Sequence, residues 1–166
     1  MTSVLGGQQL SEVNVLNEKL TLVFTNSHKP LSPIINMVTW SNYSHVAMLS
    51  TDMLTVVHST LGGGGVKEIP FTELLDASKD FTFIEFSVND AEAILAAARS
   101  QIGKPYDWTA LVGIPFHRDW QEADSWFCSE LVAWAFQEGG TPLFLSEEVH
   151  RIVPRHLYML HPTRTS

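Results

Sequence analysis

Cys128 is the only thiol in the chain and its strongest candidate nucleophile. It stands in the segment DSWFCSEL, where a helix beginning at Ser125 would place it in the first turn. Free backbone N–H groups and the positive end of the helix dipole lie there, and both favour a thiolate over a thiol. The same N–H groups can receive an oxyanion. Cys128 is therefore a candidate for acyl transfer, although most free cysteines are small buried apolar residues.

His45 is the candidate base, because a thiol nucleophile needs a proton acceptor within hydrogen-bond reach. It lies at the entrance of a predicted strand over residues 44–50, where an imidazole can face a cleft while the rest of the strand is buried. His58 lies on the next predicted strand and comes close to His45 if the two strands form a hairpin. It could then fix the tautomer of the base. The chain has seven histidines, so an ordinary structural role for either one is the alternative interpretation.

The elements that would position these side chains follow from the hydrophobic pattern and the turn residues. Apolar and β-branched runs predict strands over residues 20–25, 44–50, 53–59, 66–69 and 81–88, with a turn at Thr51-Asp52. Cap and stop signals predict helices at Ser32-Pro33 and residues 34–40, at 70–76, and at 91–102 after Asn89-Asp90. They also predict a helix capped by Asp124 or Ser125 that runs to 137 or 138 before Gly139-Gly140. Residues 151–160 predict a final turn or strand. Central strands flanked by helices indicate an α+β fold.

Composition bounds the class of protein. The 166 residues fit a single domain, residues 1–166, in which 1–18 form a loosely packed arm, and 45% hydrophobic content is typical of a globular chain. A formal charge of −8 disfavours a nucleic-acid partner. One cysteine excludes an internal disulfide and a cysteine-based zinc cluster. Neither a signal peptide nor a membrane-spanning segment is expected, which suggests the cytoplasm, with an unknown oligomeric state.

Two other features invite a functional interpretation that the sequence does not support. The run of glycines at 62–65 lacks the GK[ST] ending of a phosphate loop and precedes no helix, so a turn at the rim of a cleft is the better interpretation. His150 and His156 flank a proline and lack the helical spacing of a zinc pair. No metal and no cofactor is therefore expected.

Several segments, in this order, resemble a known group of enzymes. They are LTLVFT, YSHVAML, VVHSTLGGGGV, IGKPYDW and WFCSELV, with IVPRHLY as a closing piece. Together they span about residues 20–160, and FCSELV and GKPYDW are the more specific pieces. The chain resembles the circularly permuted papain-like group of the NlpC-type superfamily, the YiiX/YaeF-like hydrolases.

The resemblance implies a permuted papain-like α+β fold, with an antiparallel sheet or small barrel packed against helices and the cysteine at a helix start. Cys128 matches the nucleophile of the family and His45 its base. The third polar position of the family is often Glu; here the alignment places His58 there, or Ser59 or Thr60 if it slips. Tyr106 matches a tyrosine near the nucleophile, and its hydroxyl could bind the oxyanion together with the Cys128 N–H.

The expected function is that of a thiol hydrolase acting on a cell-wall peptide or another small amide. An acyl or lipid esterase or acyltransferase of the same fold is the first alternative, with residues 111–116 (LVGIPF) lining an apolar groove. The second alternative is a binding or structural module that has lost its activity. A Cys128 sulfur well beyond about 4 Å from the nearer His45 nitrogen would favour that module.

Overall fold

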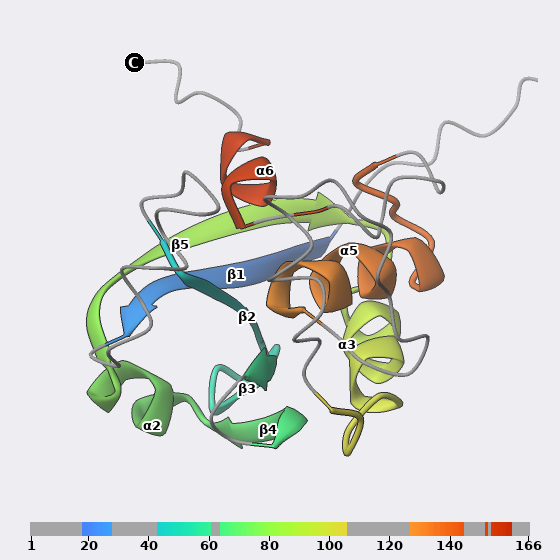
Figure 1. Ribbon diagram of the computed structural model, residues 1–166. Coiled ribbons are helices and arrows are strands. Elements are labelled where there is room, and N and C mark those ends of the chain that lie inside the picture. The colour runs from blue at the N-terminus through green and yellow to red at the C-terminus, as the bar shows by residue number, and fades with distance from the viewer. Residues whose placement is uncertain are drawn as a thin grey trace, which may run out of the picture.

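Five strands of the described chain form one open antiparallel sheet, in the order β4-β3-β2-β1-β5 (Figure 1). The computed structural model describes residues 18–27, 43–60, 64–105, 127–144, 152 and 154–160. The strands are β1 (Glu18–Ser27), β2 (His45–Leu49), β3 (Thr55–Thr60), β4 (Gly65–Pro70) and β5 (Ser78–Val88). The predicted antiparallel sheet is confirmed, and these strands do not close into a barrel.

Helices in the described residues are α2 (Phe71–Asp76), α3 (Ala91–Arg99), α5 (Cys128–Glu138) and α6 (Pro154–Met159). Helix α3 begins where predicted because Asp90 Oδ1 accepts a hydrogen bond from the Ala93 N–H at 2.8 Å. Helices α3 and α5 lie side by side (Figure 1). Gly139, which ends α5, permits their close approach, because a Cβ there would lie 2.3 Å from Ile94 Cγ1.

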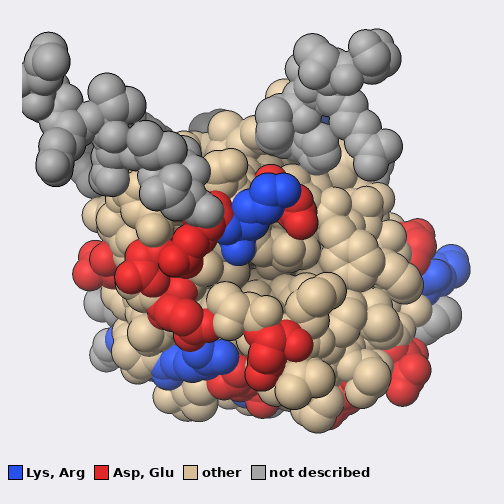
Figure 2. Space-filling view, turned by 180° about the vertical axis from the view of Figure 1, so that it is seen from behind, with Lys and Arg blue, Asp and Glu red and all other residues tan. Residues whose placement is uncertain are grey.

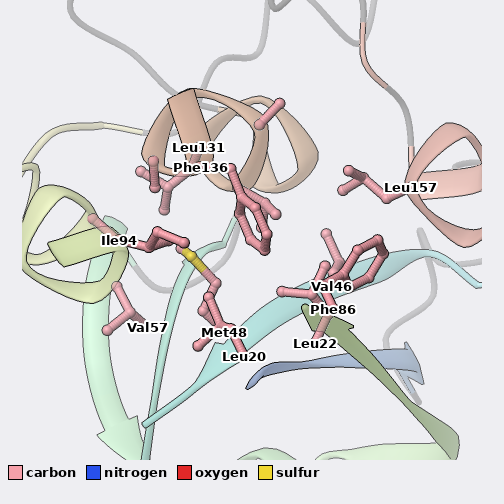
Figure 3. Close-up of a cluster of buried hydrophobic side chains, with 14 of the residues drawn as sticks. Leu20, Leu22, Val46, Met48, Val57, Phe86, Ile94, Leu131, Phe136 and Leu157 are labelled. Atoms are coloured by element: carbon pink, nitrogen blue, oxygen red, sulfur yellow. The ribbon is translucent and has the colours of Figure 1, made fainter. Parts of the chain in front are cut away.

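The core has two parts, one on each face of the sheet. Alternate residues of a strand point to opposite faces. Val46 and Met48 of β2 join the larger cluster beneath α3, α5 and α6, part of which Figure 3 shows. Ala47 and Leu49 join a smaller cluster that includes Leu74 of α2. Strand β2 is thus buried on both faces, which is why its sequence, HVAML, is entirely apolar after the histidine.

Each strand begins one to three residues from its predicted start, and two of these shifts have a clear cause. Strand β3 begins at Thr55 rather than 53, because the turn before it includes Met53 with a φ of 61° and is closed by the Ser50 N–H donating to the Thr55 carbonyl at 2.9 Å. Strand β5 begins at Ser78 rather than 81, since its pairing with β1 continues through a bulge to Ser27. In both places backbone pairing, which the hydrophobic pattern does not report, sets the boundary.

Both long helices are shorter than predicted. Helix α3 ends at Arg99, because the next N–H groups bond three residues back, as in Ile102 N–H to the Arg99 carbonyl at 3.1 Å. Helix α5 begins at Cys128 rather than Ser125, because Phe127 is extended, with φ −74° and ψ 148°. The predicted helix at 34–40 and residues 1–17 of the predicted arm lie outside the described residues. The tail contains α6, a short helix.

The glycine run has a structural function at Gly65. The segment before residue 106 lies against β4, where the Val66 N–H donates to the Lys104 carbonyl at 2.8 Å and the Gly103 N–H to the Val66 carbonyl at 2.9 Å. A Cβ on Gly65 would meet the Lys104 carbonyl oxygen at 1.9 Å. Gly65 therefore allows β4 and the segment at Lys104 to touch, and this contact fixes the position of the chain just before residue 106.

Gly65→Ala should destabilise the protein more than Gly64→Ala. Both glycines have positive φ, +93° and +89°, so alanine suffers similar backbone strain at either position. Only at Gly65 does the added methyl meet backbone, which should cost about 1–3 kcal/mol more. Urea unfolding of the two variants measures the difference. Equal losses would show that the segment at Lys104 moves away freely.

Candidate active site

The pairing of β2 with β3 stops short of the predicted base. Their ladder contains the pairs Leu49–Val56 and Met48–Val57 and ends there, although both strands continue, β2 back to His45 and β3 on to Thr60. The two strands are thus left unpaired at the end that carries the predicted site. Strand β2 remains paired on its other side, where His45 lies opposite Thr25 of β1.

The sulfur of Cys128 lies at this opening. The backbone groups of alternate residues in an antiparallel strand point to the same neighbour. Ser50 bonds to β3 through its N–H, so Met48 and Val46 also direct their N–H groups toward β3. At Val46 the hydrogen-bond acceptor is the Cys128 sulfur. The sulfur of Cys128, the first residue of α5, thereby takes the position that a β3 carbonyl would have if the ladder continued. This position is next to Val46, one residue from His45.

Two opposing effects act on the Cys128 thiol. The N–H groups of Val46, Ser129 and Cys128 itself point at the sulfur and favour the thiolate. Burial opposes them and is the larger effect, because the side chain is only 1% exposed. With the nearby Glu130 carboxylate adding to it, burial raises the pKa of Cys128 from an ordinary 9.0 to about 12. The lowered thiol pKa expected for a helix start is therefore not observed in this packing, and the resting group is a thiol.

The two residues after Cys128 hold the start of α5 in place. Glu130 is 3% exposed, and its Oε2 accepts a hydrogen bond from the Phe127 N–H at 3.3 Å. Ser129 is fully buried and donates its hydroxyl to the Ile152 carbonyl. Neither contact was predicted from the sequence. The signal for the first is a Glu at the third helical position, which commonly returns to cap its own helix.

His45 and His58 are hydrogen-bonded to each other. The distance between His45 Nε2 and His58 Nδ1 is 2.9 Å, and the ring centroids lie 5.0 Å apart at 69°. His58 is buried and His45 half-buried. The structure therefore brings together the two histidines that the sequence analysis selected. The bond uses Nε2 of His45, so a proton accepted from another group would have to go to Nδ1 of the same ring.

The alternation of side chains along β3 distinguishes His58 from Ser59, another candidate for the third catalytic residue. His58 is in phase with Val56, and His45 with Ala47, and both apolar residues belong to the smaller core cluster. Ser59 is in phase with Val57 on the face beneath α5 and is fully buried. Of His58, Ser59 and Thr60, it is His58 whose side chain bonds to His45.

Several predicted features lie outside the described residues. They are Tyr106, the possible groove at 111–116, the predicted cap at Ser125, and His150. His156 lies in α6 and is exposed. Among the residues that the structure describes, no group of three His, Cys, Asp or Glu side chains could hold a metal ion.

The surface carries the acidic excess of the sequence. Figure 2 shows one face of the molecule, on which Asp and Glu are more widespread than Lys and Arg. Some of the basic side chains are neutralised by acidic ones, as where Arg99 bonds Glu68 at 2.9 Å and Glu92 at 3.4 Å. No helix in the described part of the chain is long and apolar enough to cross a membrane.

Comparison with known proteins supplies the class. A family model described as permuted papain-like amidase enzyme, YaeF/YiiX, matches residues 19–151. The crystal structure of metalloprotein yiiX from Escherichia coli has a similar fold, with a TM-score of 0.56 and 23% identity over 76% of this chain and 68% of that one. No curated protein matches the chain.

The fold is thus papain-like in a permuted order, in which the histidine strand precedes the cysteine helix. The family model spans most of the chain, so this protein belongs to the permuted papain-like amidases of the YaeF/YiiX family. Both the predicted resemblance and the predicted enzyme class, a papain-like cysteine hydrolase, are confirmed.

The buried thiol predicts how stability changes at alkaline pH. Between the unfolded pKa near 9.0 and the folded pKa of about 12, the unfolded thiol ionises while the folded one keeps its proton. The unfolded state then binds fewer protons, so stability falls as pH rises, by at most about 1.4 kcal/mol per pH unit from this group. Cys128→Ser should lack this component.

Urea unfolding of both proteins between about pH 8 and pH 11 measures this effect, since the lysines and tyrosines common to both cancel in the difference. Parallel stability curves would contradict a thiol that is harder to ionise when folded. A wild-type protein that gains stability over Cys128→Ser as pH rises would indicate a thiolate already formed in the folded state.

Proposed function

We propose that this protein hydrolyses amide bonds of small molecules or peptides, with Cys128 as nucleophile, His45 as base and His58 as the residue that orients the base. The observation that carries the proposal is the hydrogen bond between His45 and His58, at 2.9 Å, one residue along β2 from the N–H that contacts the Cys128 sulfur. The family supplies the amidase class.

In the proposed reaction the Cys128 sulfur lies in the opening between β2 and β3. Strand phase directs the His45 ring toward the other face of the sheet, and its Nδ1 takes the thiol proton across this opening as the sulfur attacks the carbonyl carbon. The imidazolium then protonates the leaving amine, the C–N bond breaks, and a thioester remains. Water, deprotonated by the same imidazole, hydrolyses the thioester to a carboxylic acid and restores the thiol. The Cys128 N–H, at the start of α5, and Tyr106 are the proposed donors to the oxyanion.

The role of His58 follows from the direction of its hydrogen bond. When His45 carries the transferred proton, both of its ring nitrogens are donors, so His58 Nδ1 has to accept. His58 must then be neutral with its proton on Nε2. A second proton on the pair would remove the acceptor and place two like charges side by side.

Hydrolysis of a set of amide and ester substrates tests the roles of Cys128 and His45. Cys128→Ala should abolish turnover, and His45→Ala should lower kcat by about 10²–10⁴-fold, because general-base catalysis contributes that much. Cys128→Ser is the matched control for packing. Full activity in Cys128→Ser or in His45→Ala would refute the mechanism. Turnover of acyl esters but not of amides would instead select the esterase alternative.

Two substitutions at His58 separate orientation from packing. Asn places its Oδ1 near the position of the histidine Nδ1 and can accept the same hydrogen bond, whereas Leu cannot. His58→Leu should lower kcat by about 10²-fold with little change in KM, and His58→Asn should recover most of that loss. Equal activity in both variants would exclude the orienting role.

A further inference from the structure

Strand β5 is an edge of the sheet in the described part of the chain, and it is unusually long. It has 11 residues and pairs with β1 on one side, while no described strand lies on the other. An edge of this length presents a row of backbone donors and acceptors that a further strand can use. A bulge opposite Asn26 and Ser27 interrupts the pairing near the start of β5, so the regular part of the edge begins at Asp80.

The backbone groups available at this edge follow from the alternation across the sheet. The Val46 N–H points toward β3, so the backbone groups of its neighbours in β2 point toward β1. Following the same alternation across β1 to β5, the N–H and C=O groups of Thr82 and Ile84 point toward β1. The N–H and C=O groups of Phe81, Phe83 and Glu85 point away from the sheet.

Exposed aromatic side chains accompany this edge. Phe81 and Phe83 are 46% and 45% exposed, and their ring centroids lie 5.4 Å apart. Phe83 also contacts Phe71 of α2 edge-to-face, at 5.9 Å. Three neighbouring aromatic rings in partial contact with water form an apolar patch beside unpaired backbone groups, a combination typical of an interaction surface.

The sequence of β5 is complementary to itself in one antiparallel register. We propose that two copies of this protein pair through their β5 edges about a two-fold axis at Thr82. In this register Phe81 lies opposite Phe83 of the second copy, and Phe83 opposite its Phe81. Both pairs use the outward-pointing backbone groups, so the two sheets join into one.

Charge complementarity selects this register over its neighbours. With the axis at Thr82, the side chain of Lys79 comes opposite Glu85 of the second copy, twice per dimer. Lys79 is the extra residue at the bulge, and its long flexible side chain is exposed. Glu85 already bonds Lys19 at 2.7 Å, so it would lie between two cations. An axis at Phe83 would place Phe81 opposite Glu85 and leave one aromatic pair.

Reversing the charges one at a time tests the proposal without touching the core. Wild type should show a concentration-dependent dimer between about 10 μM and 1 mM in sedimentation equilibrium, as expected for a small interface. Lys79→Glu and Glu85→Lys should each dissociate at least about tenfold more readily, because each places like charges opposite one another. The double variant should dimerise like wild type.

The decisive arm mixes the two single variants. Lys79→Glu places two acidic residues at each end of the interface, and Glu85→Lys two basic ones, so an equimolar mixture should form a heterodimer that neither protein forms with itself. Glu138→Lys, an exposed position on α5, is the control for net charge and should dimerise like wild type. A wild type that stays monomeric at about 1 mM, or single variants that fail to combine, would overturn the proposal.

Cysteine cross-linking checks the register independently. Thr82→Cys should oxidise to a disulfide-linked dimer, because only this axis places residue 82 opposite itself in a pair without backbone hydrogen bonds between its members. Phe83→Cys should not, since its counterpart in this register is Phe81. The native Cys128 is buried and should not contribute. Faster cross-linking at 83 than at 82 would refute the axis at Thr82.

Discussion

The site depends on a place where the sheet is left unpaired. If β2 and β3 stayed paired to their ends, a β3 carbonyl would accept the Val46 N–H and the sulfur of Cys128 would have no position there. Beyond Met48 the two strands form no ladder hydrogen bonds with each other. Helix α5 packs over the sheet, with its Leu131 and Phe136 fully buried. A helix can thus present its first residue to a strand because two strands separate beneath it.

The same packing keeps the Cys128 thiol protonated at rest. Three backbone N–H groups surround the sulfur, and in water this would favour the thiolate. The site excludes water so completely that desolvation outweighs them. The fold nevertheless holds these N–H groups in place, and they remain directed at any negative charge that develops there. In the proposed mechanism these N–H groups would act on the negative charge that develops during the reaction.

The sequence predicted the central elements because their signals are local. The run HVAML, the Asp90 cap and the Gly139 stop each act within a few residues, and each was found in place. The predicted start of α5 was three residues too early, because the Phe127 N–H bonds to the buried Glu130 and Phe127 is extended. The pairing of His45 with His58 was predicted from a hairpin, but their hydrogen bond depends on strand phase, which a one-residue slip would have reversed. The raised thiol pKa was missed since burial is a property of the whole fold.

A histidine in the third position changes how charge is balanced in the proposed mechanism. The Glu that is common there would bring a full negative charge to stabilise the imidazolium of the base. The neutral His58 brings only a lone pair on Nδ1, so the ion pair of Cys128 and His45 receives less stabilisation. Burial raises the thiol pKa and opposes the same ion pair from its other side. The thiol therefore keeps its proton at rest, and in the proposed mechanism proton transfer accompanies the attack on the carbonyl instead of preceding it.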